Sequence, residues 1–228
     1  RMPVNKIAME FILASGGYIA APSANTSGRP SCTTAQHVIE DLGGKIEMII
    51  DGGPVGIGIE STIVDMTGEI PCLLRPGYIN PDMLKSVLGE VGIDPAIGGT
   101  LPDGTHPKAP GMKYKHYAPK GELYIVTGET ENVINKINEL AAASEAAGDK
   151  TAVIAADETR NSYRCGIVRD IGSRNNEEEI AHNLFAVLRE FDDEGVKTIY
   201  TEEFNTPNMG MAIMNRLIKA AGHKVINA

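Results

Sequence analysis

The sequence predicts an α/β fold made of two units. Three observations lead to this prediction. After residue 121, short apolar runs alternate with amphipathic helical segments, which is typical of a parallel sheet covered by helices. Residues 91–120 are rich in proline and glycine, as expected for a connection between units. The residues before this connection carry their own succession of helix and strand signals.

The first unit begins with a predicted helix over residues 5–15, which two glycines end. Thr33 and Gln36 fit a capping box, so a second helix is predicted to start there and run to Leu42. An apolar run on each side of this second helix is interpreted as a strand: a buried one at 18–21 and another at 46–50.

A hairpin and a third helix complete the first unit. The β-rich runs 59–66 and 70–75 flank Thr67-Gly68, a dipeptide that favours a tight turn. Asn80 precedes a proline and an aspartate, which together form a helix start, and the helix closes at Gly89.

The second unit is predicted as alternating strands and helices. The strands are predicted at 123–126, 152–155, 165–168 and 198–201, and the helices at 130–147, 177–194 and 209–221. No Gly-x-Gly-x-x-Gly follows the first of these strands, so the sequence gives little support to dinucleotide binding.

Composition excludes several classes of protein. The net charge of −9 argues against a broad surface for nucleic acid. No apolar run is long enough to cross a bilayer, and the first residues lack a signal-peptide pattern. Cys32, Cys72 and Cys165 lie far apart and match no metal spacing. We therefore expect a cytoplasmic protein with reduced thiols and no resident metal.

The most informative segment is the polar loop 21–31, which follows an apolar run. Ser23, Asn25 and Ser31 offer short donors and acceptors on a backbone that two prolines stiffen. Such a loop after a strand suits binding of an anion or a nucleotide. The alternative is a structural turn, because serine, asparagine, glycine and proline dominate turns.

Two further segments carry candidate binding residues. Between Gly56 and Thr62, glycines permit close approach of a ligand and Ser61 offers a hydroxyl; a glycine-rich hairpin entry is the alternative. Glu60 there is either a general base or a solvated or ion-paired residue. Arg75 ends an apolar strand, where it needs a phosphate or a carboxylate partner, so a structural ion pair is also open.

All three segments lie at predicted strand ends and can converge on one pocket. They offer hydroxyls, an amide, glycines and an arginine, without a cysteine–histidine pair, a metal cluster or a serine triad. This inventory suits phosphate and nucleotide chemistry, where positioning and charge stabilisation carry catalysis.

Four motifs occur here in the order known from one family: Ser23-Ala24-Asn25 with Gly28-Arg29-Pro30-Ser31, the run Gly58–Thr62, the run Leu74–Gly77, and the run Pro110–Pro119. On these motifs the chain resembles threonylcarbamoyl-AMP synthases of the two-domain YrdC-like type. The resemblance implies a YrdC-like twisted α/β catalytic domain over 1–90, a linker or lid over 91–121, and a small Rossmann-like parallel-sheet domain over 122–228. It also implies that the first part of the catalytic domain, with a signature lysine and arginine, is absent from this chain, which leaves the activity of the chain itself open.

The resemblance implies a nucleotidyltransferase for tRNA t6A modification. Threonine, bicarbonate and ATP, with Mg²⁺ accompanying the ATP, give L-threonylcarbamoyladenylate and pyrophosphate. The resemblance also implies that the downstream tRNA threonylcarbamoyl transferase complex receives the adenylate, and it leaves open a weak contact with tRNA. Alternatives are a YrdC-like RNA-binding module, an inactive fragment, or a carbamoyltransferase maturation protein, whose cysteine-rich zinc fingers are lacking here.

Site residues follow from the same resemblance. The ATP-binding positions are Ser23, Asn25, Ser31, Arg75, His116 and Tyr117, with Arg75 as the catalytic residue and the choice between the histidine and the tyrosine left open. Threonine-binding positions are Ala21, through its backbone, and Ser61. The basic and aromatic run Lys113–Tyr117 is interpreted as a lid over the nucleotide.

Overall fold

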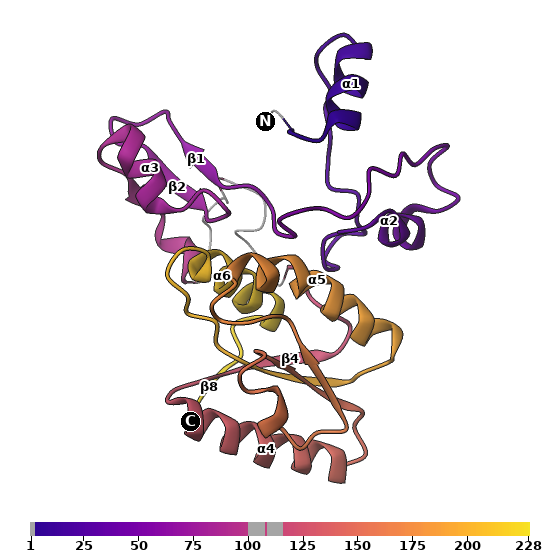
Figure 1. Cartoon of the computed structure of the whole chain (residues 1–228), viewed down its shortest axis with the longest axis vertical. Helices are drawn as coiled ribbons and strands as arrows, with labels where there is room; N and C mark the ends of the chain where they lie inside the picture. Colours follow the sequence, from indigo (N-terminus) through magenta and orange to yellow (C-terminus); the bar gives the residue numbers. More distant parts are fainter. Residues whose placement is uncertain (1–2, 100–107, 109–115) are drawn as a thin grey trace.

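The computed structural model describes residues 3–99, 108 and 116–228. These residues form two sheets, one of three strands in the order β1-β2-β3 and one of five strands in the order β6-β5-β7-β4-β8. The two sheets lie toward opposite ends of the molecule (Figure 1). None of the helices in the described ranges combines the length and apolar character needed to cross a membrane.

The larger sheet is parallel throughout, as predicted. Its strands are β4 (Glu122–Thr127), β5 (Thr151–Ala155), β6 (Ile167–Asp170), β7 (Thr198–Glu202) and β8 (Val225–Asn227). Strand β6 lies two residues beyond its predicted start, and β8 is absent from the prediction. Strand β8 has only three residues and begins soon after a helix, so it is too short to show an alternating apolar pattern in the sequence.

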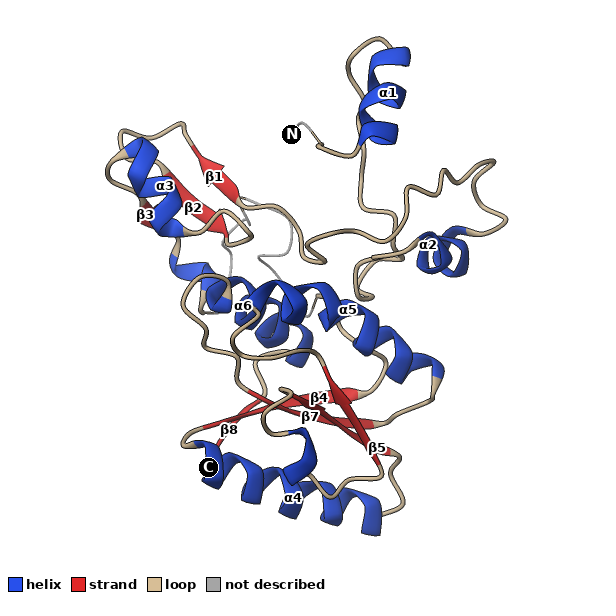
Figure 2. Cartoon of the chain, in the orientation of Figure 1, coloured by secondary structure: helices blue, strands red, loops and turns tan. Residues whose placement is uncertain are grey.

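Helices cover both faces of this sheet (Figure 2). They are α4 (Thr130–Ala146), α5 (Glu177–Asp193) and α6 (Gly210–Ala221), close to their predicted bounds. Alternate residues of β4 face opposite sides: Leu123 and Ile125 join the core under α5 and α6, whereas Val126 joins the core under α4. A short 3₁₀ helix, η2 (Arg160–Ser162), follows β5.

The smaller sheet carries the predicted hairpin. Its strands are β1 (Ile63–Asp65), β2 (Cys72–Arg75) and β3 (Gly92–Ile93), and the helices of this unit are α1 (Lys6–Ala14), α2 (Ala35–Leu42), α3 (Pro81–Leu88) and the 3₁₀ helix η1 (Pro95–Ile97). Strands β1 and β2 are antiparallel, and β3 adds to β2 in parallel. Asn80 caps α3 as predicted, because its side chain accepts from the Met83 amide at 2.9 Å.

The predicted strands at 18–21 and 46–50 are wrong: both segments are loops. Tyr18 is 91% exposed and Met48 is 76% exposed. A strand forms only where a neighbour pairs with its backbone groups, and within the described ranges no strand lies beside either segment. Both segments are apolar, but apolar side chains do not by themselves provide the neighbouring strand that a β-strand needs.

The predicted capping box is displaced by one residue. Thr34, not Thr33, caps α2, since its hydroxyl accepts from the His37 amide at 3.3 Å. His37 takes the role expected of Gln36, because its Nδ1 accepts from the Thr33 amide at 3.2 Å. Gln36 instead donates to Glu40. Two neighbouring threonines made the register ambiguous in the sequence.

Helices α5 and α6 lie between the parallel sheet and the first unit (Figure 1). They therefore join the two units. Of the predicted lid, Lys113–Lys115 lies outside the described residues, whereas His116 and Tyr117 are described.

Candidate functional site

Three segments that are distant in the sequence meet where β2 ends. The Arg75 Nε donates to the carbonyl of Ser61 at 3.0 Å. The hydroxyl of Ser31 donates to Oε1 of Glu60, the residue before Ser61. The predicted residues Ser31, Ser61 and Arg75 therefore share one neighbourhood.

The turn after Arg75 approaches the 60–62 segment too closely for any side chain. A Cβ on Gly77 would lie 2.5 Å from the Thr62 nitrogen and 2.8 Å from the Glu60 carbonyl oxygen. Glycine is thus required for the contact between the two backbones. The Pro76-Gly77 pair places Arg75 beside Ser61.

His116 and Tyr117 lie against the same residues. Their rings meet edge to face at 4.2 Å between centroids, and Tyr117 is 2% exposed. The Nδ1 atom of His116 is buried and has no hydrogen-bond partner among the described residues. A buried nitrogen without a partner is costly, so this atom is the position in the cluster best suited to meet a ligand.

Burial controls the protonation of both residues. It lowers the pKa of His116; the Glu60 carboxylate opposes this shift, and Arg75 and Arg216 reinforce it. Burial also raises the pKa of the Tyr117 hydroxyl, as does Glu60, while Arg216 and Arg75 oppose that shift. At neutral pH the site therefore presents a neutral imidazole and a protonated phenol beside two guanidinium groups.

The remaining predicted residues do not join this cluster. Asn25 donates to the carbonyls of Thr26 at 3.0 Å and Arg29 at 3.2 Å, so it braces its own loop. Across the part of the chain that the structure describes, no hydrogen bond or ion pair connects Ala21 or Ser23 to the cluster. Their assignment to the site stays a prediction.

Glu60 is ion-paired, which was one of the two readings open from the sequence. Its Oε2 lies 3.0 Å from the Nε of Arg216, a residue of α6 whose side chain is fully buried. The sequence reasoning missed Arg216 because it lies far along the chain. The available signal was a single arginine within the apolar stripe of a predicted helix.

A second buried arginine holds the polar loop. Arg189 of α5 donates to the Pro30 carbonyl at 2.7 Å and to Asp41 at 2.9 Å, and Arg29 pairs with the same carboxylate. Burial alone would raise the pKa of Asp41, but hydrogen bonds from Arg189 and Thr26 and the two arginine charges hold it below its usual value. This cluster, also missed from the sequence, anchors the loop one residue before Ser31.

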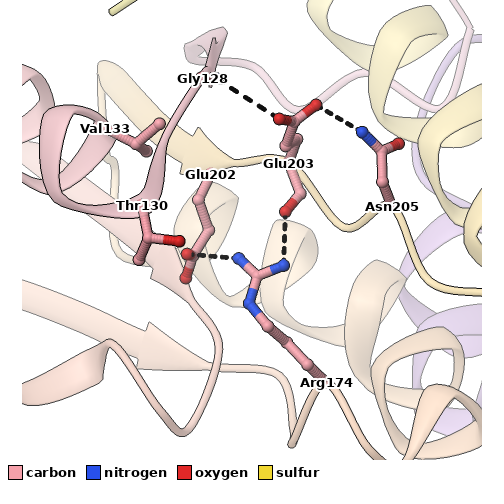
Figure 3. A pocket seen from close by; sticks show the side chains of 7 residues that line it. All are labelled: Gly128, Thr130, Val133, Arg174, Glu202, Glu203 and Asn205. Atoms are coloured by element: carbon pink, nitrogen blue, oxygen red, sulfur yellow. Dashed lines mark hydrogen bonds and ion pairs between the residues drawn. The ribbon is translucent and has the colours of Figure 1, made fainter.

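A separate small cavity of about 110 Å³ opens at the carboxyl ends of β4 and β7 (Figure 3). Its lining residues are Gly128, Thr130, Val133, Arg174, Glu202, Glu203 and Asn205. Arg174 already donates to the Glu202 carboxylate at 2.6 Å and to the Glu203 carbonyl at 2.9 Å. Its charge is therefore neutralised within the protein. The described residues contain no group of three or more His, Cys, Asp or Glu side chains placed to hold a metal.

Comparison with known proteins bears on this geometry. A family model described as threonylcarbamoyl-AMP synthase, C-terminal domain, matches residues 79–222. A second family model, described as telomere recombination, matches residues 1–77. The chain belongs to the threonylcarbamoyl-AMP synthase family. The resemblance seen in the sequence motifs is thereby confirmed.

Relatives in this family match almost all of the chain. The threonylcarbamoyl-AMP synthase of Pyrococcus abyssi is 47% identical over 226 residues, which are 99% of this chain and 64% of that protein. The Bacillus subtilis enzyme is 42% identical, with 99% and 63% covered. The Schizosaccharomyces pombe enzyme is 37% identical, with 97% and 56% covered. The chain thus spans less than two thirds of the length of these relatives.

Solved structures agree. The crystal structure of the P. abyssi protein complexed with L-threonine superposes with a TM-score of 0.91 at 46% identity, covering 100% of this chain and 65% of that one. A P. abyssi variant with an adjacent histidine and tyrosine replaced by alanine gives a TM-score of 0.91 at 45% identity, with 100% and 64% covered. The predicted α/β fold class is confirmed.

Proposed function

We propose that the protein forms L-threonylcarbamoyladenylate and pyrophosphate from threonine, bicarbonate and ATP, as a step in t6A modification of tRNA. The observation that carries the proposal is the convergence of Ser31, Ser61 and Arg75 beside His116 and Tyr117, in a chain of this family. The catalytic domain in this proposal covers residues 1–90, the linker 91–121, and the Rossmann-like domain 122–228.

The proposed chemistry needs positioning and positive charge. The threonine amine takes up carbon dioxide from bicarbonate with loss of water, giving a carbamate. A carbamate oxygen then attacks the α-phosphorus of ATP, and the bond to the β-phosphate breaks as pyrophosphate leaves with the electron pair. Negative charge grows on phosphate oxygens, so a fixed guanidinium stabilises the transition state.

Arg75 is our candidate for that guanidinium. Its Nε donates to the Ser61 carbonyl. This hydrogen bond fixes the plane of the guanidinium group beside the cluster that contains His116. In this proposal His116 or Tyr117 contacts the nucleotide, and the buried Nδ1 of His116 supports the histidine. The alanine-substituted P. abyssi variant concerns such a pair, and His116-Tyr117 is the His-Tyr dipeptide of this sequence.

Threonine binding is proposed at Ser61 and at the backbone of Ala21. The P. abyssi protein with L-threonine bound supports threonine as the amino-acid substrate. Ser23 and Asn25 complete the proposed ATP contacts, Mg²⁺ enters with the ATP as part of the substrate, and the tRNA-modifying complex takes the product. The unpaired cysteines support a reducing, cytoplasmic setting.

The test is product formation from labelled bicarbonate. The protein is incubated with ATP, threonine and [¹⁴C]bicarbonate, and the adenylate and pyrophosphate are quantified by chromatography. Equal amounts of both products, each lost when threonine or bicarbonate is withheld, are expected. Salt-dependent tRNA binding without any adenylate would favour the RNA-binding alternative instead.

A further inference from the structure

The side chain of Arg216, on α6, is fully buried yet binds three groups of the first unit. Its Nε donates to Oε2 of Glu60 at 3.0 Å and its Nη2 to the Glu60 carbonyl at 2.9 Å. Its Nη1 donates to the Pro76 carbonyl. A buried guanidinium is tolerated only when such partners satisfy it. Arg216 therefore fixes both the backbone and the carboxylate of Glu60.

Glu60 passes this constraint on to Ser31. Arg216 occupies one carboxylate oxygen, and the Ser31 hydroxyl donates to the other. An ion-paired carboxylate accepts hydrogen bonds but does not donate them. The Ser31 proton is therefore committed to Glu60, and the Ser31 oxygen has only lone pairs left for a further contact.

We propose that Arg216 is a positioning residue that acts through Glu60 to make Ser31 a hydrogen-bond acceptor toward the nucleotide. The inference rests on the proposed function, in which Ser31 contacts ATP. An acceptor cannot pair with a phosphate oxygen, so Ser31 recognises a donor of ATP, either a ribose hydroxyl or the adenine amino group. The second unit thus determines the polarity of a contact made by the first.

Glu60→Gln is the variant that separates this role from a purely structural one. All groups that Arg216 offers are donors, so the glutamine must turn its carbonyl oxygen toward Arg216. Its amide then faces Ser31 and donates to the serine oxygen. The Ser31 proton is released toward the ligand, and its preference for a donor is lost without any change in side-chain size.

The experiment compares ATP with three analogues that each lack one donor: 2′-deoxy-ATP, 3′-deoxy-ATP and purine riboside triphosphate. Binding is measured by titration calorimetry. We expect the wild-type protein to bind one analogue roughly three- to tenfold more weakly than ATP, as for one hydrogen bond. Ser31→Ala, Glu60→Gln and Arg216→Met should each abolish that difference, and Arg216→Lys should restore only part of it.

Arg174→Met is the control, since Arg174 is an arginine of the second unit whose hydrogen bonds go to the Glu202 carboxylate and the Glu203 carbonyl, not to Glu60 or the loop that carries Ser31. It should lower the melting temperature and keep the analogue preference. The inference is overturned if Glu60→Gln keeps the wild-type preference, if the wild-type protein binds all analogues like ATP or binds no ATP, or if Arg174→Met also loses the preference. Where Arg216→Met does not fold, Glu60→Gln still decides.

Failure of the proposed function gives a different result. A wild-type protein that shows the analogue preference but forms no threonylcarbamoyladenylate contradicts the proposed reaction and leaves the role of Arg216 standing. Adenylate formation without any analogue preference contradicts the role of Arg216 alone.

Discussion

The imidazole of His116 shows how one side chain can be set by its surroundings. Burial holds its pKa below the usual value, so the folded chain binds a proton there less readily than the unfolded chain. As the pH falls below the ordinary histidine pKa of about 6.5, the unfolded chain is protonated first and the contribution of His116 to stability declines.

We expect the NMR titration midpoint of His116 to lie below that of a model histidine. If nucleotide binding needs the neutral imidazole of His116, it should weaken only at a pH below the pKa of an ordinary histidine. Assignment by a His116→Gln variant identifies the resonance. A midpoint at or above the ordinary value would show that the imidazole is paired with Glu60 as a cation.

A variant of Arg75 can distinguish a role in stabilising phosphate charge from a purely structural role. If Arg75 binds the ATP phosphates as proposed, removing this charge-assisted contact costs about 1.5–3 kcal/mol, so Arg75→Ala should reduce adenylate formation roughly ten- to hundredfold. Steady-state kinetics and the melting temperature are measured together. A lower melting temperature with normal kinetics would establish that Arg75 serves only to hold the Ser61 carbonyl.

Ser61 is the matching test on the amino-acid side. If Ser61 binds threonine as proposed, the site discriminates against substrates that lack a hydroxyl, so Ser61→Ala should raise the KM for threonine with a smaller effect on the KM for ATP. Kinetics at varied threonine and fixed ATP measure this. A defect confined to ATP would move Ser61 out of the threonine site.

For single residues, the sequence predicted members of the site where a residue type is unusual for its position in the chain. Arg75 at the end of an apolar strand and Ser31 in a stiff loop stood out, and both lie in the cluster. Arg189 and Arg216 did not, because their partners Asp41 and Glu60 lie well over a hundred residues earlier. Nothing in local spacing reveals such distant ion pairs.

At the scale of elements, Gly58 determines how the 56–62 turn meets α5. It has a φ of +84°, and a Cβ there would lie 2.4 Å from the Ala181 carbonyl oxygen. Gly58→Ala should therefore destabilise the protein by about 1–3 kcal/mol through strain and overpacking. Thermal unfolding measures the loss.

Gly56→Ala is the control, since a Cβ on Gly56 would meet nothing within 4 Å. It should leave the melting temperature nearly unchanged. Equal losses in the two variants would mean that flexibility of the turn matters, rather than its contact with α5.

Elements were predictable where their stabilising contacts are local or follow a strong period. The helices α4, α5 and α6 carry long amphipathic patterns, and α3 carries its cap and proline. The loops at 18–21 and 46–50 show the limit, because an apolar run states that a segment prefers burial but not which strand lies beside it.

At the scale of the whole molecule, buried charge joins the two units. The Arg189 and Asp41 side chains are 1% and 0% exposed, so losing the arginine leaves a buried carboxylate with Arg29 as its remaining hydrogen-bonded cation. Arg189→Met should destabilise the protein by about 3 kcal/mol, as measured by denaturant unfolding.

Arg160→Met is the control, because the Arg160–Asp170 pair is largely exposed, at 52% and 33%. Such pairs contribute at most about 1 kcal/mol, so the unfolding midpoint should hardly move. If the two variants were equally stable, the contact between the units would depend on apolar packing rather than on Arg189.

The hydrogen bonds from these arginines to backbone carbonyls have a consequence for how sequences in the family can diverge. Arg189 and Arg216 reach the carbonyl oxygens of Pro30 and Pro76, and Asn215 reaches that of Ile97. Every amino acid carries that oxygen, so residues of the loops can be substituted during evolution without loss of these hydrogen bonds. What must be kept is the backbone path of each loop and the side chains that donate to it. A chimera that takes its two units from different relatives should therefore assemble wherever the loops keep their lengths.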